Sequence, residues 1–162
     1  MKDRKLRYVF KLFISIVACQ CAGLIGSAFT TPAIPTWYAA LEKPLFTPPN
    51  WLFAPAWITL YILMGISASL VWRRGLDNTR VRTALIAFLV QLVLNASWSV
   101  VFFGLESPLY GVIVIVALWI AIVLTIVKFF RISTLAGALL LPYIAWVTFA
   151  AILNAAILIL NS

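Results

Sequence analysis

Side chains that are able to hold a ligand recur at helical spacing in three apolar segments of this 162-residue chain. Each set combines aromatic rings with amide or small residues three or four positions apart, which places its members on one face of a helix. The sets are Trp57, Tyr61, Met64 and Ala68; Gln91, Asn95, Trp98 and Phe102; and Tyr143, Trp146, Ala150 and Asn154. Rings that converge from several helices would stack on a flat, largely apolar molecule, and the amides would anchor its few polar atoms.

The amides also have a structural explanation. Because an amide is costly to expose to lipid, Gln91, Asn95 and Asn154 should point into a helical bundle and form interhelical hydrogen bonds, worth about 0.6–2 kcal/mol each. For Asn154 alone, this structural role and a role in ligand binding are equally favoured. The rings that share a face with each amide add weight to ligand binding.

Most other kinds of active-site chemistry are excluded by what the chain lacks. There is no histidine, which removes imidazole metal sites and the most common general base. The only carboxylates are Asp3, Glu42, Asp77 and Glu106, all outside the long apolar segments, so no acid–base pair can be assembled. We therefore expect no metal site, no required cofactor, and a function that depends on rings, amides and shape.

The composition indicates a membrane protein. Hydrophobic residues make up 65% of the chain and charged residues only 10%, and a membrane-spanning helix needs about 20 apolar residues. Five stretches qualify, at about 8–29, 51–72, 83–105, 108–127 and 134–160. Since the later connections are short, we predict an all-α bundle of five transmembrane helices that forms a single domain over residues 1–162. Pro142 should kink the fifth helix and free a backbone carbonyl.

The charged residues predict the orientation of the bundle. Cations concentrate in the arm before the first stretch, between the second and third, and after the fourth, at Lys128 and Arg131. The remaining connections hold only Glu42 with Lys43, and Glu106. This alternation places the amino terminus on the cytoplasmic side. A net charge of +8 also raises the possibility of nucleic-acid binding, but cations that bracket apolar spans form no single basic face, so we expect no nucleic-acid partner. We expect these cations to meet anionic membrane lipids.

The connection at residues 30–50 is expected to cover a binding pocket. The run from Trp37 to Trp57 contains four prolines and three tryptophans, and Pro44, Pro48 and Pro49 prevent a continuous helix there. A loop this apolar suits a lid at the membrane surface, where tryptophan and tyrosine are favoured. Lys43, or backbone donors, would meet the carboxylates of a ligand.

Several motifs together resemble the TspO/MBR family of tryptophan-rich sensory proteins, which are related to the mitochondrial translocator protein. They are W-Y-x-x-L-x-K-P-x-F-x-P-P from Trp37 to Pro49, W-x-F-x-P-A-W from Trp51 to Trp57, Q-x-x-x-N-x-x-W from Gln91 to Trp98, and P-Y-x-x-W-x-x-F-A-x-x-L-N from Pro142 to Asn154. The motifs extend over nearly the whole chain and occur in the family's order.

The resemblance implies a five-helix bundle, commonly a homodimer, that binds porphyrins such as protoporphyrin IX or haem, and synthetic isoquinoline or benzodiazepine ligands. It implies roles in tetrapyrrole transport, sensing or stress regulation. At the family's motif positions, Trp57, Asn95, Trp146 and Ala150 would line the pocket, with Trp37, Tyr61 and Trp98 nearby. To these the residue pattern adds Tyr143. A bacterial cell membrane is the expected location, with the outer membrane as the alternative.

Two other functions stay open. The first is light-dependent degradation of a bound porphyrin, an enzymatic activity in which Trp57 and Trp146 would be the redox residues. The second is a membrane scaffold that regulates partners and has no ligand of its own.

Overall fold

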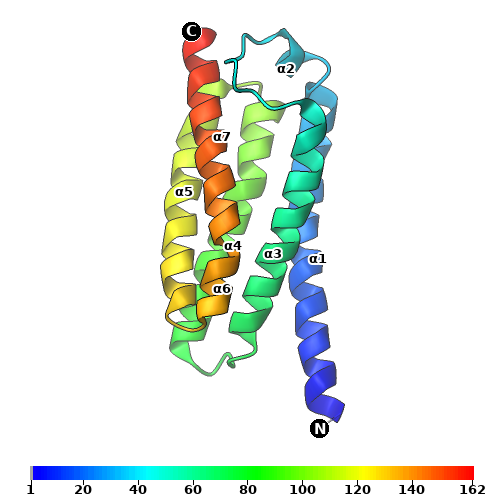
Figure 1. The fold of residues 1–162 in the computed structure, drawn as a ribbon, viewed down its shortest axis with the longest axis vertical. Helices are drawn as coiled ribbons and strands as arrows, with labels where there is room; N and C mark the ends of the chain where they lie inside the picture. Colours follow the sequence, from blue (N-terminus) through cyan, green and yellow to red (C-terminus); the bar gives the residue numbers. More distant parts are fainter. Residues whose placement is uncertain (1) are drawn as a thin grey trace.

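Five helical columns form the molecule (Figure 1). In the computed structural model, which describes residues 2–162 and the side chains from Lys5 onward, five helices are long and apolar enough to cross a membrane. The columns are α1 (Lys2–Ala33), α3 (Phe53–Trp72), α4 (Thr79–Ser99), α5 (Pro108–Phe130), and α6 (Thr134–Leu139) with α7 (Leu141–Leu160). The described residues contain no strand. The prediction of an all-α bundle with five transmembrane helices is confirmed.

Side-chain caps begin three of the helices. The side chain of Asn78 accepts a hydrogen bond from the Arg80 N–H at 2.9 Å, that of Ser107 from Tyr110 at 3.4 Å, and that of Ser133 from Ala136 at 3.3 Å. Each cap satisfies a backbone donor that the first turn of a helix leaves unpaired. These polar residues therefore set where the apolar spans begin.

The third column ends in a π-helical turn, η2 (Val100–Gly104). The Leu105 N–H donates to the Val100 carbonyl at 3.0 Å, five residues back instead of four. Such turns contain one extra residue and are frequent at functional sites. Here the turn carries Phe102 and Phe103, both of which face the interior cavity described below.

The fifth column is interrupted at Leu140, between α6 and α7, with Pro142 in the first turn of α7. The Leu140 N–H donates to Gly137 at 3.1 Å, so the Ala136 carbonyl lacks its usual helical partner. The Ser67 hydroxyl on α3 donates to that carbonyl at 2.6 Å. The expected kink is thus an interruption of the helix just before Pro142, and a neighbouring helix satisfies the Ala136 carbonyl that the interruption leaves unpaired.

The connection between the first two spans is shorter than predicted, because α1 continues to Ala33. It contains the short helix α2 (Trp37–Ala40), an irregular segment through Pro49, and one 3₁₀ turn, η1 (Asn50–Leu52). We call residues 34–49 the lid. At its far side, the Asn161 side chain beyond α7 accepts from the Glu42 N–H at 3.0 Å and donates to the Glu42 carbonyl at 2.9 Å.

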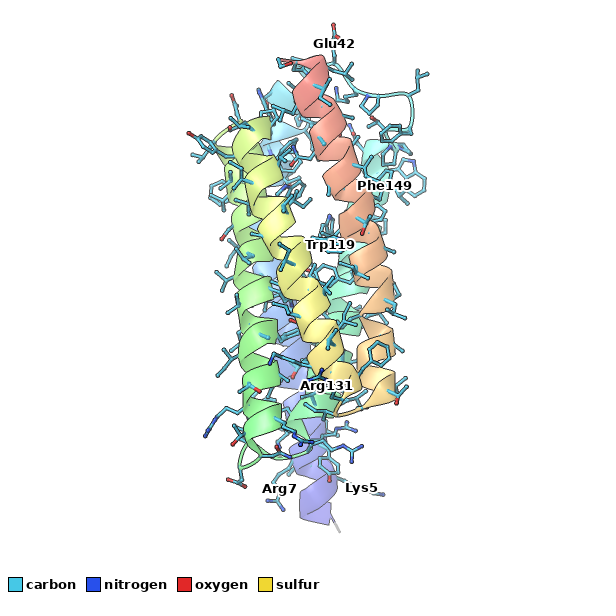
Figure 2. The ribbon with its side chains drawn as sticks, turned by 90° about the vertical axis from the view of Figure 1, so that its left-hand side faces the viewer. Lys5, Arg7, Glu42, Trp119, Arg131 and Phe149 are labelled. Carbon is cyan, nitrogen blue, oxygen red and sulfur yellow. The ribbon has the colours of Figure 1, made fainter. Side chains whose placement is uncertain are left out.

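The two ends of the bundle differ in charge. Figure 2 shows Lys5, Arg7 and Arg131 at one end and Glu42, within the lid, at the other. The basic arm and the basic connections lie at the end of the bundle opposite the lid. This arrangement is the one expected when the chain crosses the membrane an odd number of times. The side of the membrane on which the amino terminus lies stays a prediction, and the side chains of Lys2, Asp3 and Arg4 lie outside the described part of the chain.

Candidate ligand-binding site

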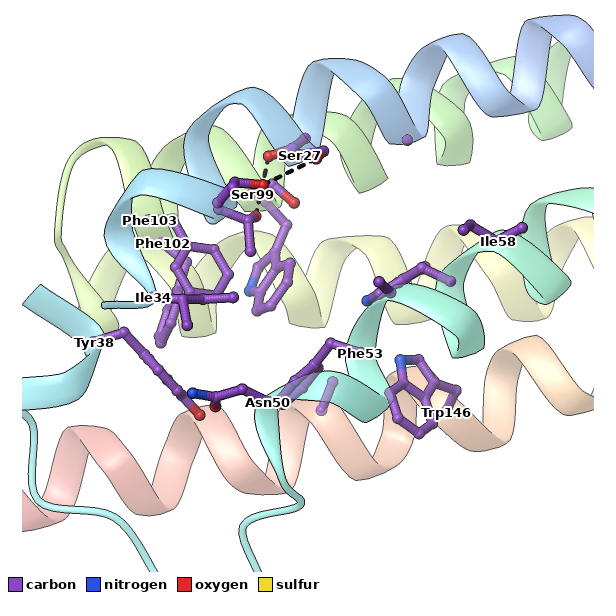
Figure 3. Close-up of a pocket in the computed structure, with 18 of the residues that line it drawn as sticks. Ser27, Ile34, Tyr38, Asn50, Phe53, Ile58, Ser99, Phe102, Phe103 and Trp146 are labelled. Atoms are coloured by element: carbon purple, nitrogen blue, oxygen red, sulfur yellow. Dashed lines mark hydrogen bonds between the residues drawn. The ribbon is translucent and has the colours of Figure 1, made fainter. Parts of the chain in front are cut away.

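A cavity of about 280 Å³ lies beneath the lid, among α1, α3, the end of α4 and α7. Figure 3 shows its lid end, where Tyr38 and Asn50 lie, and the rings of Phe53 and Trp146 along its length. Most of the lining is aromatic or aliphatic. Leu24 on α1 and Ile58 on α3 line the cavity and are also 70% and 53% exposed, so the cavity wall between these two helices is one side chain thick.

Two stacked ring pairs form much of the wall. Trp57 and Tyr61, one turn apart on α3, have ring centroids 5.5 Å apart and planes inclined by 27°. Trp98 and Phe102 are 5.3 Å apart and inclined by 17°. Phe102 follows Trp98 by four residues, a spacing that brings two side chains together on one helix face, and it lies within the π-helical turn. The ring of Trp146 completes the wall on α7.

Below the cavity, a chain of buried hydrogen bonds joins α3, α4 and α7. The Tyr61 hydroxyl donates to the Asn95 side-chain oxygen at 2.5 Å, the Asn95 amide donates to the Tyr143 hydroxyl at 3.0 Å, and that hydroxyl donates to the Gln91 side-chain oxygen at 2.7 Å. All four side chains are buried. We call this set the polar floor. Since it satisfies most of its own polar atoms, it holds the helices together rather than offering groups to a ligand.

Asn154 plays a related part at the side of the cavity. Its side-chain oxygen accepts from the Trp98 indole N–H at 3.1 Å, and its amide donates to the Pro108 carbonyl at 3.0 Å. These bonds connect α7 to α4 and to the first residue of α5. Asn154 also lines the cavity, so the structural role expected for it is present, and its side chain fixes the orientation of the Trp98 ring.

One buried polar atom at the lid end has no partner. The hydroxyl of Tyr38, a side chain that is 3% exposed and lines the cavity, makes no hydrogen bond within the described structure. Burial raises the pKa of this phenol, so it stays protonated and can donate. An unsatisfied buried donor is costly, and Tyr38 is therefore a candidate anchor for a polar group on a ligand.

The structure brings most of the predicted site residues together. Trp57, Tyr61, Trp98, Trp146 and Ala150 line the cavity. Trp37, Asn95 and Tyr143 do not belong to its lining.

Those three residues support the site from outside. Trp37 packs edge-on against Phe102 at 5.4 Å, and Asn95 and Tyr143 belong to the polar floor. Lys43 is also absent from the lining. Its ammonium donates to the Leu41 carbonyl at 2.8 Å and lies 5.0 Å from the centre of the Tyr38 ring.

Sequence reasoning overlooked the contribution of α1. Gly23, Ser27 and Thr30 on this helix line the cavity. A Cβ atom at Gly23 would lie 2.5 Å from the Tyr61 ring, so only glycine permits this approach of α1 to α3. A signal was available in the sequence. Gln20, Ser27 and Thr31 are polar residues within an apolar span, and their spacings of seven and four place them on one helix face, which indicates a face turned toward the interior.

The chemistry of the site is that of binding. Among the described residues, no three histidine, cysteine, aspartate or glutamate side chains come together as a metal site would require. The cavity offers aromatic faces, a phenol and amides. Fold and site together define an integral, multi-pass membrane protein with an internal, ring-lined cavity.

Comparison with known proteins places the chain within that class. The TspO/MBR family pattern matches residues 15–160. The chain is 50% identical over 155 residues to tryptophan-rich protein TspO of Archaeoglobus fulgidus, covering 95% of this chain and 99% of that protein. It is 42% identical over 148 residues to protein CrtK of Rhodobacter capsulatus, covering 91% of each.

The similarity extends to animal proteins. Human translocator protein is 36% identical over 131 residues, which cover 80% of this chain and 78% of that protein. The chain belongs to the TspO/MBR family, as the sequence motifs predicted.

Proposed function

We propose that this protein binds porphyrins, such as protoporphyrin IX or haem, and similar flat apolar molecules in the cavity beneath the lid, and that it acts in tetrapyrrole transport, sensing or stress regulation. The observation that carries the proposal is the cavity wall itself, in which Trp57, Trp98 and Trp146 come from three different helices. Planar ligands gain both apolar burial and ring stacking in such a site. Isoquinoline and benzodiazepine compounds have the same flat, apolar character.

The polar atoms of the cavity support an orientation for the ligand. Tyr38 and Asn50 lie at the lid end (Figure 3), where the ligand's carboxylates would reach the membrane surface. The opposite end is closed by the apolar faces of Trp57 and Tyr61. A macrocycle would therefore enter with its apolar edge inward and its carboxylates toward the lid.

Binding should not depend on a metal in the porphyrin. The chain has no histidine to serve as an axial ligand, and the protein requires no cofactor under this proposal. Protoporphyrin IX and haem should bind within about tenfold of each other. A much higher affinity for the iron or zinc porphyrin would contradict binding by stacking alone.

Quenching of tryptophan fluorescence on addition of protoporphyrin IX tests the proposal directly. Trp146→Phe should weaken binding and reduce the quenching, while Trp119→Phe is the matched control, because Trp119 is 39% exposed on α5 and is absent from the cavity lining. Failure of the unmodified protein to bind any porphyrin, and of porphyrin or an isoquinoline to raise its thermal midpoint, would favour a scaffold without a ligand.

One observation favours a second candidate, light-dependent degradation of the bound porphyrin. The two candidate redox residues, Trp57 and Trp146, both line the cavity, and Trp57 stacks on Tyr61. With dissolved oxygen as the oxidant, these rings could supply electrons to the illuminated complex. Loss of the Soret band under light would reveal the activity, and an unchanged rate in both Trp57→Phe and Trp146→Phe would rule out these donors.

We further propose that the protein is a homodimer in the cell membrane of a bacterium, with the outer membrane as the alternative location. The exposed apolar faces of the helices meet lipid or the second copy. Cross-linking in native membranes would measure the oligomeric state.

A further inference from the structure

The cavity is small for the ligand class proposed above, on which this inference rests. Sites for drug-sized molecules enclose about 300–1,000 Å³, and a tetrapyrrole is a large member of that range. The cavity measures about 280 Å³. A macrocycle therefore has to extend beyond it, and the structure offers two directions, between α1 and α3 or between α3 and α7.

A second recess, a groove of about 730 Å³, lies between α3 and α7 on the outer surface of the bundle. Its lining includes Trp51, Pro55 and Thr59 from the η1–α3 segment and Pro142 and Ala145 from α7. All five are exposed, so the groove faces the surrounding lipid. Figure 1 shows the two helices separating toward the lid end of the bundle.

The groove and the cavity share a wall of two rings, Trp146 and Phe149, which line both recesses. Both side chains are only half-buried. Trp146 is held by an edge contact with Phe53 at 6.2 Å and by Phe149 at 5.8 Å, and its indole N–H makes no hydrogen bond within residues 2–162. Rotation of this ring breaks no hydrogen bond and gives up only its contacts with Phe53 and Phe149, which a stacked ligand ring would replace.

The two possible openings differ in how firmly they are closed. Between α1 and α3, the Gln20 amide donates to the Ile58 carbonyl at 3.2 Å, and the backbone at Gly23 lies against the Tyr61 ring. Between α3 and α7, the described structure contains no hydrogen bond, and the ring contacts are those of Phe53 with Trp146 at 6.2 Å and of Trp57 with Tyr143 at 6.3 Å. The α3–α7 side is therefore the easier one to widen.

The groove suits the apolar edge of a ligand. Pro55 and Pro142 have no backbone N–H, and the only side-chain hydroxyl, that of Thr59, already donates to the Pro55 carbonyl at 2.8 Å. The indole N–H groups of Trp51 and Trp146 are the remaining side-chain donors, and no charged side chain lines the groove to meet a carboxylate. Apolar atoms would exchange lipid contacts for contacts with Trp51, Leu52 and the shared rings.

We propose that the α3–α7 groove is an annex of the ligand site. Trp146 and Phe149 swing aside, and the part of a porphyrin that exceeds the cavity occupies the groove, in contact with lipid. Small ligands stay within the cavity and leave the groove empty. The groove thereby sets the upper size limit of the ligands that the protein accepts.

The test compares two ligands of different size in a groove-filling variant. Ala145 lines the groove and not the cavity, so Ala145→Phe blocks the annex alone. Its affinity for protoporphyrin IX should fall at least tenfold, while its affinity for a small isoquinoline carboxamide stays within twofold of the unmodified protein. Ala117→Phe is the matched control, because Ala117 is exposed on α5 and lines neither recess.

The outcomes separate this inference from the proposed function. If the unmodified protein binds neither ligand, the proposed function fails. If it binds both, and Ala145→Phe leaves protoporphyrin affinity unchanged or weakens both ligands equally, the annex is refuted. A loss of protoporphyrin binding in Leu24→Trp but not in Ala145→Phe would instead show that the ligand extends between α1 and α3.

Two measurements keep the inference testable if Ala145→Phe does not fold. Thr59→Phe fills the groove from its opposite wall and should give the same size-dependent result. In the unmodified protein, bilayers of brominated phosphatidylcholine should quench the fluorescence of bound protoporphyrin at least twofold more than that of a bound fluorescent isoquinoline. If the brominated lipid quenches both bound ligands to the same extent, contact between the porphyrin and the membrane is refuted.

Discussion

Replacing Tyr143 with phenylalanine tests two roles against each other. The sequence predicted that Tyr143 binds the ligand, whereas the structure places it in the polar floor, where it joins helices. Tyr143 is 1% exposed. Its hydroxyl accepts from Asn95 at 3.0 Å and donates to Gln91 at 2.7 Å. The substitution keeps the ring and removes only this oxygen, so it deletes two interhelical hydrogen bonds without creating a large cavity.

The expected loss of stability follows from those two bonds. Interhelical hydrogen bonds in membrane proteins average about 0.6 kcal/mol and reach about 1.7 kcal/mol. Tyr143→Phe should therefore lower the free energy of unfolding by about 1–3 kcal/mol. We expect a value near the upper end of this range, because the substitution leaves Asn95 and Gln91 with buried unpaired atoms. Ligand affinity should change less than threefold, since Tyr143 does not line the cavity.

Equilibrium unfolding in mixed detergent micelles would measure the free energy, and fluorescence titration the affinity. Tyr110→Phe is the control, because Tyr110 is 58% exposed and its loss should cost less than about 0.5 kcal/mol. The combination of Tyr143→Phe with Gln91→Leu should be less destabilising than the sum of the two changes, because both remove the same bond. Unchanged stability together with a tenfold weaker affinity for protoporphyrin would refute the polar floor and restore Tyr143 as a ligand contact.

Three further changes test other parts of the site. Ala150→Leu places three more carbon atoms in the cavity, so protoporphyrin affinity should fall at least tenfold while the thermal midpoint is unchanged or higher; equal affinity would mean that the ligand binds elsewhere. Trp98→Phe removes the hydrogen bond to Asn154 but keeps a ring for stacking, so it should cost about 0.6–1.7 kcal/mol of stability in the same unfolding assay. Burial raises the pKa of Tyr38, so the folded state loses stability as pH rises above the ordinary tyrosine pKa of about 10; Tyr38→Phe should remove part of this alkaline loss, and an identical pH profile would contradict it.

The three buried amides show how much helical periodicity in the sequence could predict. Gln91, Asn95 and Asn154 were expected to point inward because amides avoid lipid, and all three are buried. The same argument could not say whether they meet each other or a ligand. That depended on Tyr61 and Tyr143 reaching Asn95 from two other helices, which is a property of helix packing.

The sequence marks only one of the two backbone irregularities in the spans. The π-helical turn at Val100–Gly104 and the break at Leu140 each change the direction of the side chains that follow. Pro142 marked the break in the sequence, whereas no residue marked the π-helical turn. Tyr143 and Trp146 both follow the break and share one face of α7, so helical spacing grouped them correctly, but it could not say that Tyr143 joins the polar floor while Trp146 lines the cavity.

The sequence by itself determined that this protein crosses a membrane five times, where the crossings lie, and which family it belongs to, because span length, charge and motif order are local properties of the chain. Only the tertiary structure decided that α1 forms one wall of the cavity and that Trp146 and Phe149 divide it from an outer groove. The physical reason is that lipid and the bundle interior are both apolar. A hydrophobic residue such as Leu24 or Phe149 therefore carries no local sign of which side it faces, and packing against the neighbouring helices settles it.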